Sequence, residues 1–177
     1  MPTPTAAELR HLQRPLKDRY RDDEGAARIP SRAVARLVGE GITATTESWS
    51  GPVTAGLHQA TGGDGSVACS ADLLLEAVAA CAGVTLRSVA VAMGVELRDA
   101  SVVVDGHWDA RGTLGVSKQV PVGLTDISIT FCFDTDSDDA TADRLVELAE
   151  RYCVVAQTLA APPAVAVHRG PGLVPAP

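Results

Sequence analysis

Residues 69–93 decide the fold of this chain, and they read CSADLLLEAVAACAGVTLRSVAVAM. Ser70 is a typical N-cap residue and Asp72 lies where the helix dipole favours an acid, so we predict a helix from about Ala71 to Met93. Gly94 follows directly, and glycine commonly ends a helix. Apolar side chains occur on nearly every side of this helix, which is typical of a helix buried in the middle of a structure.

The residues before this helix predict an antiparallel meander and a polar N-terminal helix. The glycine-rich segment Thr61–Ser66 lacks the GxxxxGK[ST] pattern of a phosphate-binding loop, so we expect a tight turn there. Residues 6–22 predict a helix with a short apolar stripe, in which Pro15 starts or kinks a helical turn. The expected strands of the meander are roughly Ala33–Val38, Ile42–Trp49 and Pro52–His58.

The residues after the central helix predict two long strands and an amphipathic helix. The strands extend over about Glu96–Arg111 and Val122–Asp134, and apolar and polar residues alternate along the second one. The helix is expected from near Ala140, through Arg151, towards Ala156. Its inward seam consists of Ala142, Leu145, Ala149, Tyr152, Cys153 and Ala156.

Length and charge indicate one folded domain with an N-terminal arm. The 177 residues have a mass of 18.3 kDa, and 46% of them are hydrophobic, which suffices for a core. Residues 1–32 are expected to form a basic, partly helical arm. Residues 33–169 form the domain, with a short closing strand at Ala164–His168, and residues 170–177 form a loose tail.

Composition excludes several classes of protein. A net charge of −7 and a total of six aromatic residues argue against a nucleic-acid partner. No apolar leader is visible, and no apolar run reaches the roughly 18 residues of a membrane span, so no membrane partner is expected. Four cysteines without a CxxC pair do not make a disulfide scaffold. We therefore expect a soluble protein of the reducing cytoplasm.

Two further chemistries receive little support from the sequence. The four cysteines and four histidines contain no close pair with metal-ligand spacing, so neither a metal nor another cofactor is expected. The GxSxG elbow and the alternation of strands and helices that accompany Ser/His/Asp hydrolysis are both missing.

Cys81 and Cys153 are the candidate reactive residues. Cys81 lies in the middle of the central helix within the sequence AACAG, whose small residues leave room for another backbone or a small substrate. Cys153 lies late in the second helix, on its inward seam. Free cysteines are usually small buried hydrophobic residues, and the residues alone leave that interpretation open beside a reactive one.

Three stretches resemble the OsmC/Ohr superfamily of osmotically inducible and organic hydroperoxide resistance proteins. They are GGDG at residues 62–65, CSADLLLEAVAAC at 69–81 and RYCVVAQTL at 151–159. The order of elements is similar as well, and the resemblance covers about Ala33–His168. It implies an α+β fold of antiparallel sheets around a long central helix, in an intertwined homodimer. The all-round apolar helix favours that homodimer, because the sheet of the second half covers only one of its faces.

The resemblance also implies a peroxiredoxin-like thiol peroxidase. In that case Cys81 is the peroxidatic thiol that attacks the O–O bond, and Cys153 resolves the resulting sulfenic acid as a disulfide. The apolar site favours organic hydroperoxides as substrates, and an external dithiol serves as the reductant. A non-catalytic relative that binds a small apolar ligand is the alternative, and the reactivity of the Cys81 thiol distinguishes the two.

Three positions depart from the family pattern. Ala71 stands where hydroperoxide-resistance members carry glutamate, the turn Trp49–Pro52 lacks an arginine, and Val154 follows the second cysteine where proline is usual. A thiolate at neutral pH usually requires a nearby cation. We therefore expect an arginine of the N-terminal region to activate Cys81, while pairing of these arginines with surface acids is the alternative. The candidates are Arg36 first, then Arg28 or Arg32.

Overall fold

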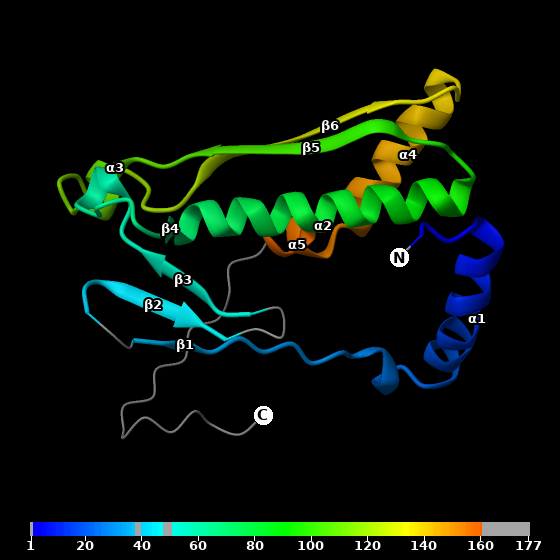
Figure 1. Ribbon diagram of the computed structural model, residues 1–177, viewed down its shortest axis with the longest axis horizontal. Helices are drawn as coiled ribbons and strands as arrows, with labels where there is room; N and C mark the ends of the chain where they lie inside the picture. Colours follow the sequence, from blue (N-terminus) through cyan, green and yellow to red (C-terminus); the bar gives the residue numbers. More distant parts are fainter. Residues whose placement is uncertain (1, 38–39, 48–50, 161–177) are drawn as a thin grey trace.

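A 24-residue helix, α2 (Ser70–Met93), forms the axis of the computed structural model (Figure 1). The structure describes residues 2–37, 40–47 and 51–160. The helix ends at Gly94, whose left-handed conformation has a φ of 72°, as the sequence predicts. The prediction that Ser70 caps the helix is wrong, because Ser70 is its first residue and the N-cap is Cys69, which makes no side-chain capping bond.

An antiparallel hairpin, β5 (Arg98–His107) and β6 (Thr125–Asp134), lies along one side of α2 (Figure 1). Half-buried and exposed residues alternate along β6, which confirms the expected apolar and polar faces. Both strands are shorter than predicted at the end where the chain turns. The reason is a short helix, α3 (Ala110–Thr113), whose N-cap Asp109 accepts a hydrogen bond from the Arg111 amide and ends the extended conformation.

The expected meander is a small sheet on the other side of α2 (Figure 1). Its antiparallel order is confirmed, but its strands are short: β1 (Ala35–Arg36), β2 (Thr43–Thr46) and β3 (Val53–Gly56). A fourth strand, β4 (Ala68–Cys69), pairs in parallel with β3 and was not expected. The predicted ends of the first two strands, Val38 and Trp49, lie outside the described residues.

The glycine-rich segment forms the expected turn. It begins in a short 3₁₀ helix, η2 (Gln59–Thr61), and continues through Gly62, whose φ of 96° favours glycine. A Cβ atom at Gly63 would lie 1.8 Å from the Leu57 carbonyl oxygen, so only glycine fits there. The Asp64 carboxylate accepts a hydrogen bond from the Ser66 amide at 2.8 Å, which closes the turn.

The N-terminal arm is a continuous helix, α1 (Ala6–Asp22), followed by a 3₁₀ turn, η1 (Gly25–Ala27). Thr5 and Glu8 form a capping box at its start. Pro15 lies inside α1 without ending it, so the predicted kink did not define a boundary. No residue of α1 is buried, although the helix packs on α2.

The core lies where α4 (Asp139–Tyr152) packs on the C-terminal half of α2. Leu145 and Ala149 of α4 are buried against Leu86 and Ala90 of α2 and against Val95. The predicted continuous helix towards Ala156 is wrong, because α4 ends at Tyr152 and a new helix, α5 (Val154–Thr158), begins after Cys153. The predicted seam is wrong at Tyr152, which is 57% exposed.

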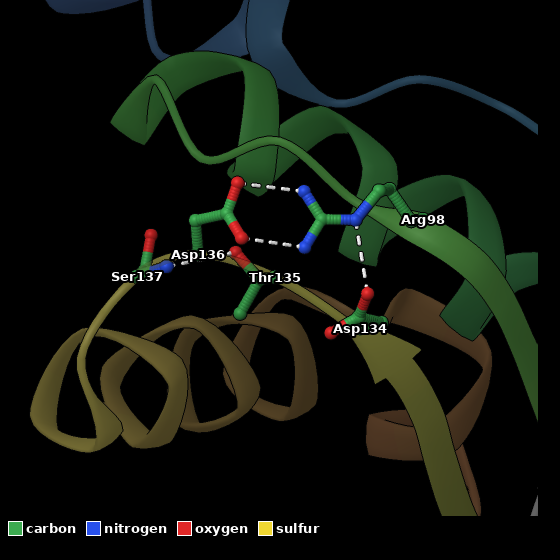
Figure 2. Close-up of polar contacts among 5 residues, drawn as sticks. All are labelled: Arg98, Asp134, Thr135, Asp136 and Ser137. Carbon is green, nitrogen blue, oxygen red and sulfur yellow. Dashed lines mark hydrogen bonds and ion pairs between the residues drawn. The ribbon is translucent and has the colours of Figure 1, made fainter.

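A salt bridge fixes the start of α4 to the hairpin. Arg98, at the start of β5, donates from Nε to Asp134 at 2.9 Å and from its two terminal nitrogens to Asp136 at 2.8 and 2.7 Å (Figure 2). Hydrogen bonds from Arg98 hold the pKa of Asp136 below its usual value. Asp138 then caps α4 by accepting from the Thr141 amide.

One face of α2 is buried within the chain, rather than all of them. The buried residues form a single stripe at a spacing of four, whereas Val84 is 72% exposed. Among the described residues, α2 is the helix that meets the length and composition of a membrane span, and a core helix meets the same criterion. The expected closing strand Ala164–His168 and the tail 170–177 lie outside the described residues. The buried stripe of α2 consists of Val78, Ala82, Leu86 and Ala90.

Candidate functional site

The structure brings Cys81 and Cys153 together. Cys81 lies in the middle of α2 and is half-buried, whereas Cys153 joins α4 to α5 and is only 1% exposed. Both are free thiols, and each of them shifts the pKa of the other. The sequence predicted each cysteine separately, and the fold makes them a dithiol pair.

The break between α4 and α5 supplies hydrogen-bond donors to this pair. Cys153 has a ψ of 98°, which ends α4 and makes Cys153 the N-cap of α5. The first amides of a helix have no acceptor within it. The amides of Val154 and Val155 accordingly lower the pKa of Cys81, and those of Val155 and Ala156 act to lower the pKa of Cys153.

Thr85 adds a hydroxyl from the next turn of α2. Its hydroxyl donates to the Cys81 carbonyl oxygen at 2.8 Å, and it also lies within hydrogen-bond reach of the Cys81 thiol. Residues four apart lie on the same face of a helix, so this contact follows directly from the helical spacing.

The net effect of these groups is to lower the pKa of Cys81. Burial is the largest single influence and raises the pKa of Cys81, because a thiolate is less stable away from water. Hydrogen bonds from the Val155 amide, the Cys153 thiol, Thr85 and the Val154 amide together outweigh it. Cys81 is thus the thiol of the pair that ionises first.

The pKa of Cys153 moves in the opposite direction. Burial is again the largest influence and raises the pKa of Cys153, and donation of its proton to the Cys81 sulfur raises it further. The amides of Ala156 and Val155 lower the pKa only in part. The sequence predicts Cys153 near the C-terminal end of a helix. In the structure Cys153 is the C-cap of α4 and also the N-cap of α5.

Arg36 lies on β1, where it forms an ion pair with Glu47. Its Nε atom is 3.2 Å from Glu47 Oε1, and both side chains are exposed. Arg28 and Arg32 lie in the exposed segment that precedes β1. Among the described residues, the groups that shift the pKa of Cys81 include no arginine.

Sequence reasoning missed Thr85 and the amides of Val154 and Val155. Thr85 carried a signal, because a hydroxyl four residues after a helical cysteine lies on the same face. The amides carried none, because the segment around Cys153 contains no glycine or proline to mark a break.

The other potential ligands lie apart from one another. Within the described ranges, no three Cys, His, Asp or Glu side chains are grouped so that they could hold a metal ion. Cys69 caps α2 and Cys132 is exposed on β6. The chemistry available to the dithiol pair is therefore that of sulfur itself: nucleophilic attack by one thiolate and disulfide formation with the other.

Comparison with known proteins identifies relatives of the chain. A family model described as OsmC-like protein matches residues 63–168. The search of the curated proteins finds no match.

Solved structures share the fold. An OsmC-like protein from Mycoplasma pneumoniae has a TM-score of 0.61 at 17% identity, over 75% of this chain and 88% of that chain. An organic hydroperoxide resistance protein OsmC from Legionella pneumophila has a TM-score of 0.53 at 19% identity, over 75% and 91%. A putative osmotic stress induced and detoxification response protein from Psychrobacter arcticus 273-4 has a TM-score of 0.57 at 17% identity, over 74% and 89%. At these identities the likeness shows the fold alone.

Proposed function

The chain belongs to the OsmC-like protein family, and from this premise we propose that it is a cysteine-based reductase of organic hydroperoxides. The observation that carries the proposal is the neighbouring pair of free thiols, Cys81 on α2 and Cys153 at the start of α5, in which the pKa of the first thiol is lowered and that of the second is raised. A thiolate is the reactive form of cysteine, so these directions assign attack to Cys81 and resolution to Cys153.

The first step oxidises Cys81 and reduces the peroxide. The Cys81 thiolate attacks the outer oxygen of the hydroperoxide, an S–O bond forms and the O–O bond breaks. The leaving alkoxide takes a proton and departs as an alcohol, and Cys81 remains as a sulfenic acid. The amides after Cys153 favour the thiolate form of Cys81 that makes this attack.

The second step forms the disulfide. The negative charge of the Cys81 thiolate helps to keep the neighbouring Cys153 protonated, and that charge disappears when Cys81 becomes a sulfenic acid. Cys153 then attacks the Cys81 sulfur, and the hydroxyl of the sulfenic acid leaves with the Cys153 proton as water. An external dithiol reduces the disulfide by exchange and becomes a disulfide itself.

We assign organic rather than inorganic peroxides as substrates because the residues around the thiol pair are apolar. Ala82 and Val78 of α2 are buried beside it, and Val154 and Val155 follow Cys153. The Legionella pneumophila relative is described as an organic hydroperoxide resistance protein, and the proposal extends that class to this chain. We place the protein in the cytoplasm, where thiols are kept reduced.

We propose that the protein acts as a homodimer. Exposed apolar side chains line the uncovered faces of α2 and of β5, and a second copy would cover them. Sedimentation at micromolar concentration should give the mass of a dimer, and a stable folded monomer would contradict this proposal. The exposed apolar side chains on the uncovered faces of α2 and β5 include Leu74, Val84 and Val103.

The role of Arg36 stays a prediction. Its ion pair with Glu47 holds it at the exposed edge of the small sheet within one chain. Alkylation of Cys81 as a function of pH, in Arg36→Ala, Arg32→Ala and Arg28→Ala, decides whether an arginine acts together with the hydrogen bonds. A higher apparent pKa of Cys81 in one variant would identify that arginine.

The experiment that tests the function is the consumption of cumene hydroperoxide in the presence of dithiothreitol. We expect the parent protein to consume the peroxide, Cys81→Ser to lose at least about a hundredfold in rate, and Cys132→Ser to keep the rate. Cys132 is the matched control because it is an exposed free cysteine on β6. One equivalent of peroxide without reductant should remove two hydrogens from the parent protein and form the Cys81–Cys153 disulfide.

Consumption no faster in the parent protein than in Cys81→Ser would overturn the peroxidase. Saturable binding of an apolar ligand without peroxide consumption would then favour a binding protein with the same fold.

A further inference from the structure

The Glu150 carbonyl oxygen, at the C-terminal end of α4, accepts two hydrogen bonds. One comes from the Cys153 amide at 3.3 Å, and the other comes from the side-chain Nε2 atom of Gln157 at 3.1 Å. Gln157 belongs to α5, so its side chain reaches back across the break and bonds to the backbone of the preceding helix. The Gln157 amide also donates to the Cys153 carbonyl oxygen at 3.0 Å, and this hydrogen bond begins α5. Gln157 therefore bonds to the chain on both sides of the break.

The oxygen that the Gln157 side chain occupies is the one that would continue α4. In an α-helix each amide donates to the carbonyl oxygen four residues earlier, so the Val154 amide of an unbroken helix would donate to Glu150. A carbonyl oxygen has two lone pairs, and here the Cys153 amide and the Gln157 side chain take both. The Val154 amide is left for the thiol pair, and it contributes to the lowered pKa of Cys81.

The local sequence contains no residue that breaks a helix. Residues 150–157 read ERYCVVAQ, without glycine or proline. The proline that usually follows the second cysteine in the family has no amide hydrogen, so it would end α4 at this point without help from a side chain. Val154 stands there in this chain and keeps its amide, so the break has another cause. The bond from Gln157 to Glu150 supplies one.

We propose that Gln157 is a positioning residue for the thiol pair, because its side chain occupies the Glu150 carbonyl oxygen and keeps the chain broken at Cys153. Gln157 is not among the groups that act on either thiol, so its effect passes through the backbone that it holds. The role rests on the proposed function only where peroxide reduction is concerned, since the ionisation of Cys81 is measured without a peroxide.

The test is the alkylation of Cys81 by iodoacetamide as a function of pH in Gln157→Met. Methionine has about the length of glutamine and no donor, so the Glu150 oxygen becomes available to the Val154 amide and α4 can continue. We expect the pH of the half-maximal rate at Cys81 to rise, and the rate at pH 7 to fall about two- to fivefold. Tm should change little, because the lost hydrogen bond is exposed.

Two further variants separate the break from the stability of α5. Thr158→Val is the matched control, because the Thr158 hydroxyl donates to the Val154 carbonyl oxygen at 2.8 Å within α5 and does not cross the break. It should keep the parent profile. Val154→Pro, added to Gln157→Met, ends α4 by means of the proline and should move the Cys81 profile back towards that of the parent. The Val155 amide, which lowers the pKa of Cys81 more than the Val154 amide does, is kept in that double variant.

The outcomes keep this inference apart from the proposed function. An unchanged Cys81 profile in Gln157→Met overturns the inference even if the protein reduces peroxides. A raised profile that Thr158→Val reproduces, or that Val154→Pro does not reverse, also overturns it, because α5 would then be loosened as a whole. A raised profile that Val154→Pro reverses and Thr158→Val does not share supports the role of Gln157 even if no peroxide is consumed.

Discussion

The helices α2 and α4 hold side chains by burial, whereas the N-terminal region holds them by polar contacts at the surface. Every described hydrophobic residue that is buried belongs to α2 or α4 or lies within two residues of the end of one of them. The N-terminal region, α1 with β1, β2 and β3, contains no buried residue in its described part. Its side chains are held by exposed hydrogen bonds and ion pairs, such as that of Arg36 with Glu47.

The difference shows which groups the chain can hold at a fixed distance. Cys81 and Cys153 lie in the packed region, where Cys153 is 1% exposed and Cys81 is half-buried on α2. Arg36 lies in the exposed region, where an ion pair contributes little to stability. A reaction between two thiols requires their sulfur atoms to meet, so we expect it in the packed region of α2 and α4. Recognition of charged groups is expected in the exposed N-terminal region.

The largest expected effect is on stability, and the same substitution tests both regions. Leu145 of α4 is fully buried, whereas Leu12 of α1 is 62% exposed. Leu145→Ala leaves a cavity and should lower the free energy of unfolding by about 2–5 kcal/mol. Leu12→Ala should change it by less than about 0.5 kcal/mol. Urea denaturation at one protein concentration measures both, and equal losses would contradict the contrast between the two regions.

The packed region is also the part that the sequence predicts best. The helix α2 follows from a long apolar segment and its end from one glycine, and the two faces of β6 follow from alternation. Burial of one face leaves a repeated pattern over many residues, so such elements are visible in a single sequence. The short strands of the N-terminal region repeat too few times to define their ends.

The details of the candidate site are less predictable. The break at Cys153 depends on one backbone angle within a segment that has good helical periodicity, so the sequence predicts a continuous helix. The same break leaves the amides of Val154 and Val155 available to lower the pKa of Cys81. The expectation of a nearby arginine does not predict such amides. Local turns of this kind are decided by tertiary packing rather than by residue preference.

A smaller effect is expected from a change to one hydrogen bond of the thiol pair. Thr85→Val removes the hydroxyl beside Cys81 and keeps the shape of the side chain, so the pKa of Cys81 should rise. The thiolate is the reactive form and is lost as pH falls, so the rate of peroxide reduction at pH 7 should fall about two- to tenfold. Ser88→Ala, one turn further along the same face, is the control and should keep the parent pH–rate profile.

The smallest effect is expected at the salt bridge between the hairpin and α4. Arg98→Met removes the partner of Asp134 and Asp136, all of which are exposed, so Tm should fall only slightly at pH 7. The pKa of Asp136 is lowered in the folded state, so its contribution is complete above the unfolded value, about 3.9, and is lost as pH falls through the folded value. Calorimetry should therefore show the parent and the variant converging in Tm as pH falls through the lowered folded pKa of Asp136. A difference that persists there would show that Arg98 acts through packing.

The most direct test of the account is the ionisation of Cys81 in the parent protein. Alkylation by iodoacetamide, quantified at each cysteine by mass spectrometry from pH 4 to pH 10, reports the thiolate fraction at Cys81 and at Cys153 separately. The hydrogen bonds from Thr85 and from the amides after Cys153 predict a half-maximal rate at Cys81 below the ordinary cysteine pKa of about 8.5, and one at Cys153 above it. Ionisation of Cys153 before Cys81, or of Cys81 at or above the ordinary value, would contradict the roles assigned to the two thiols.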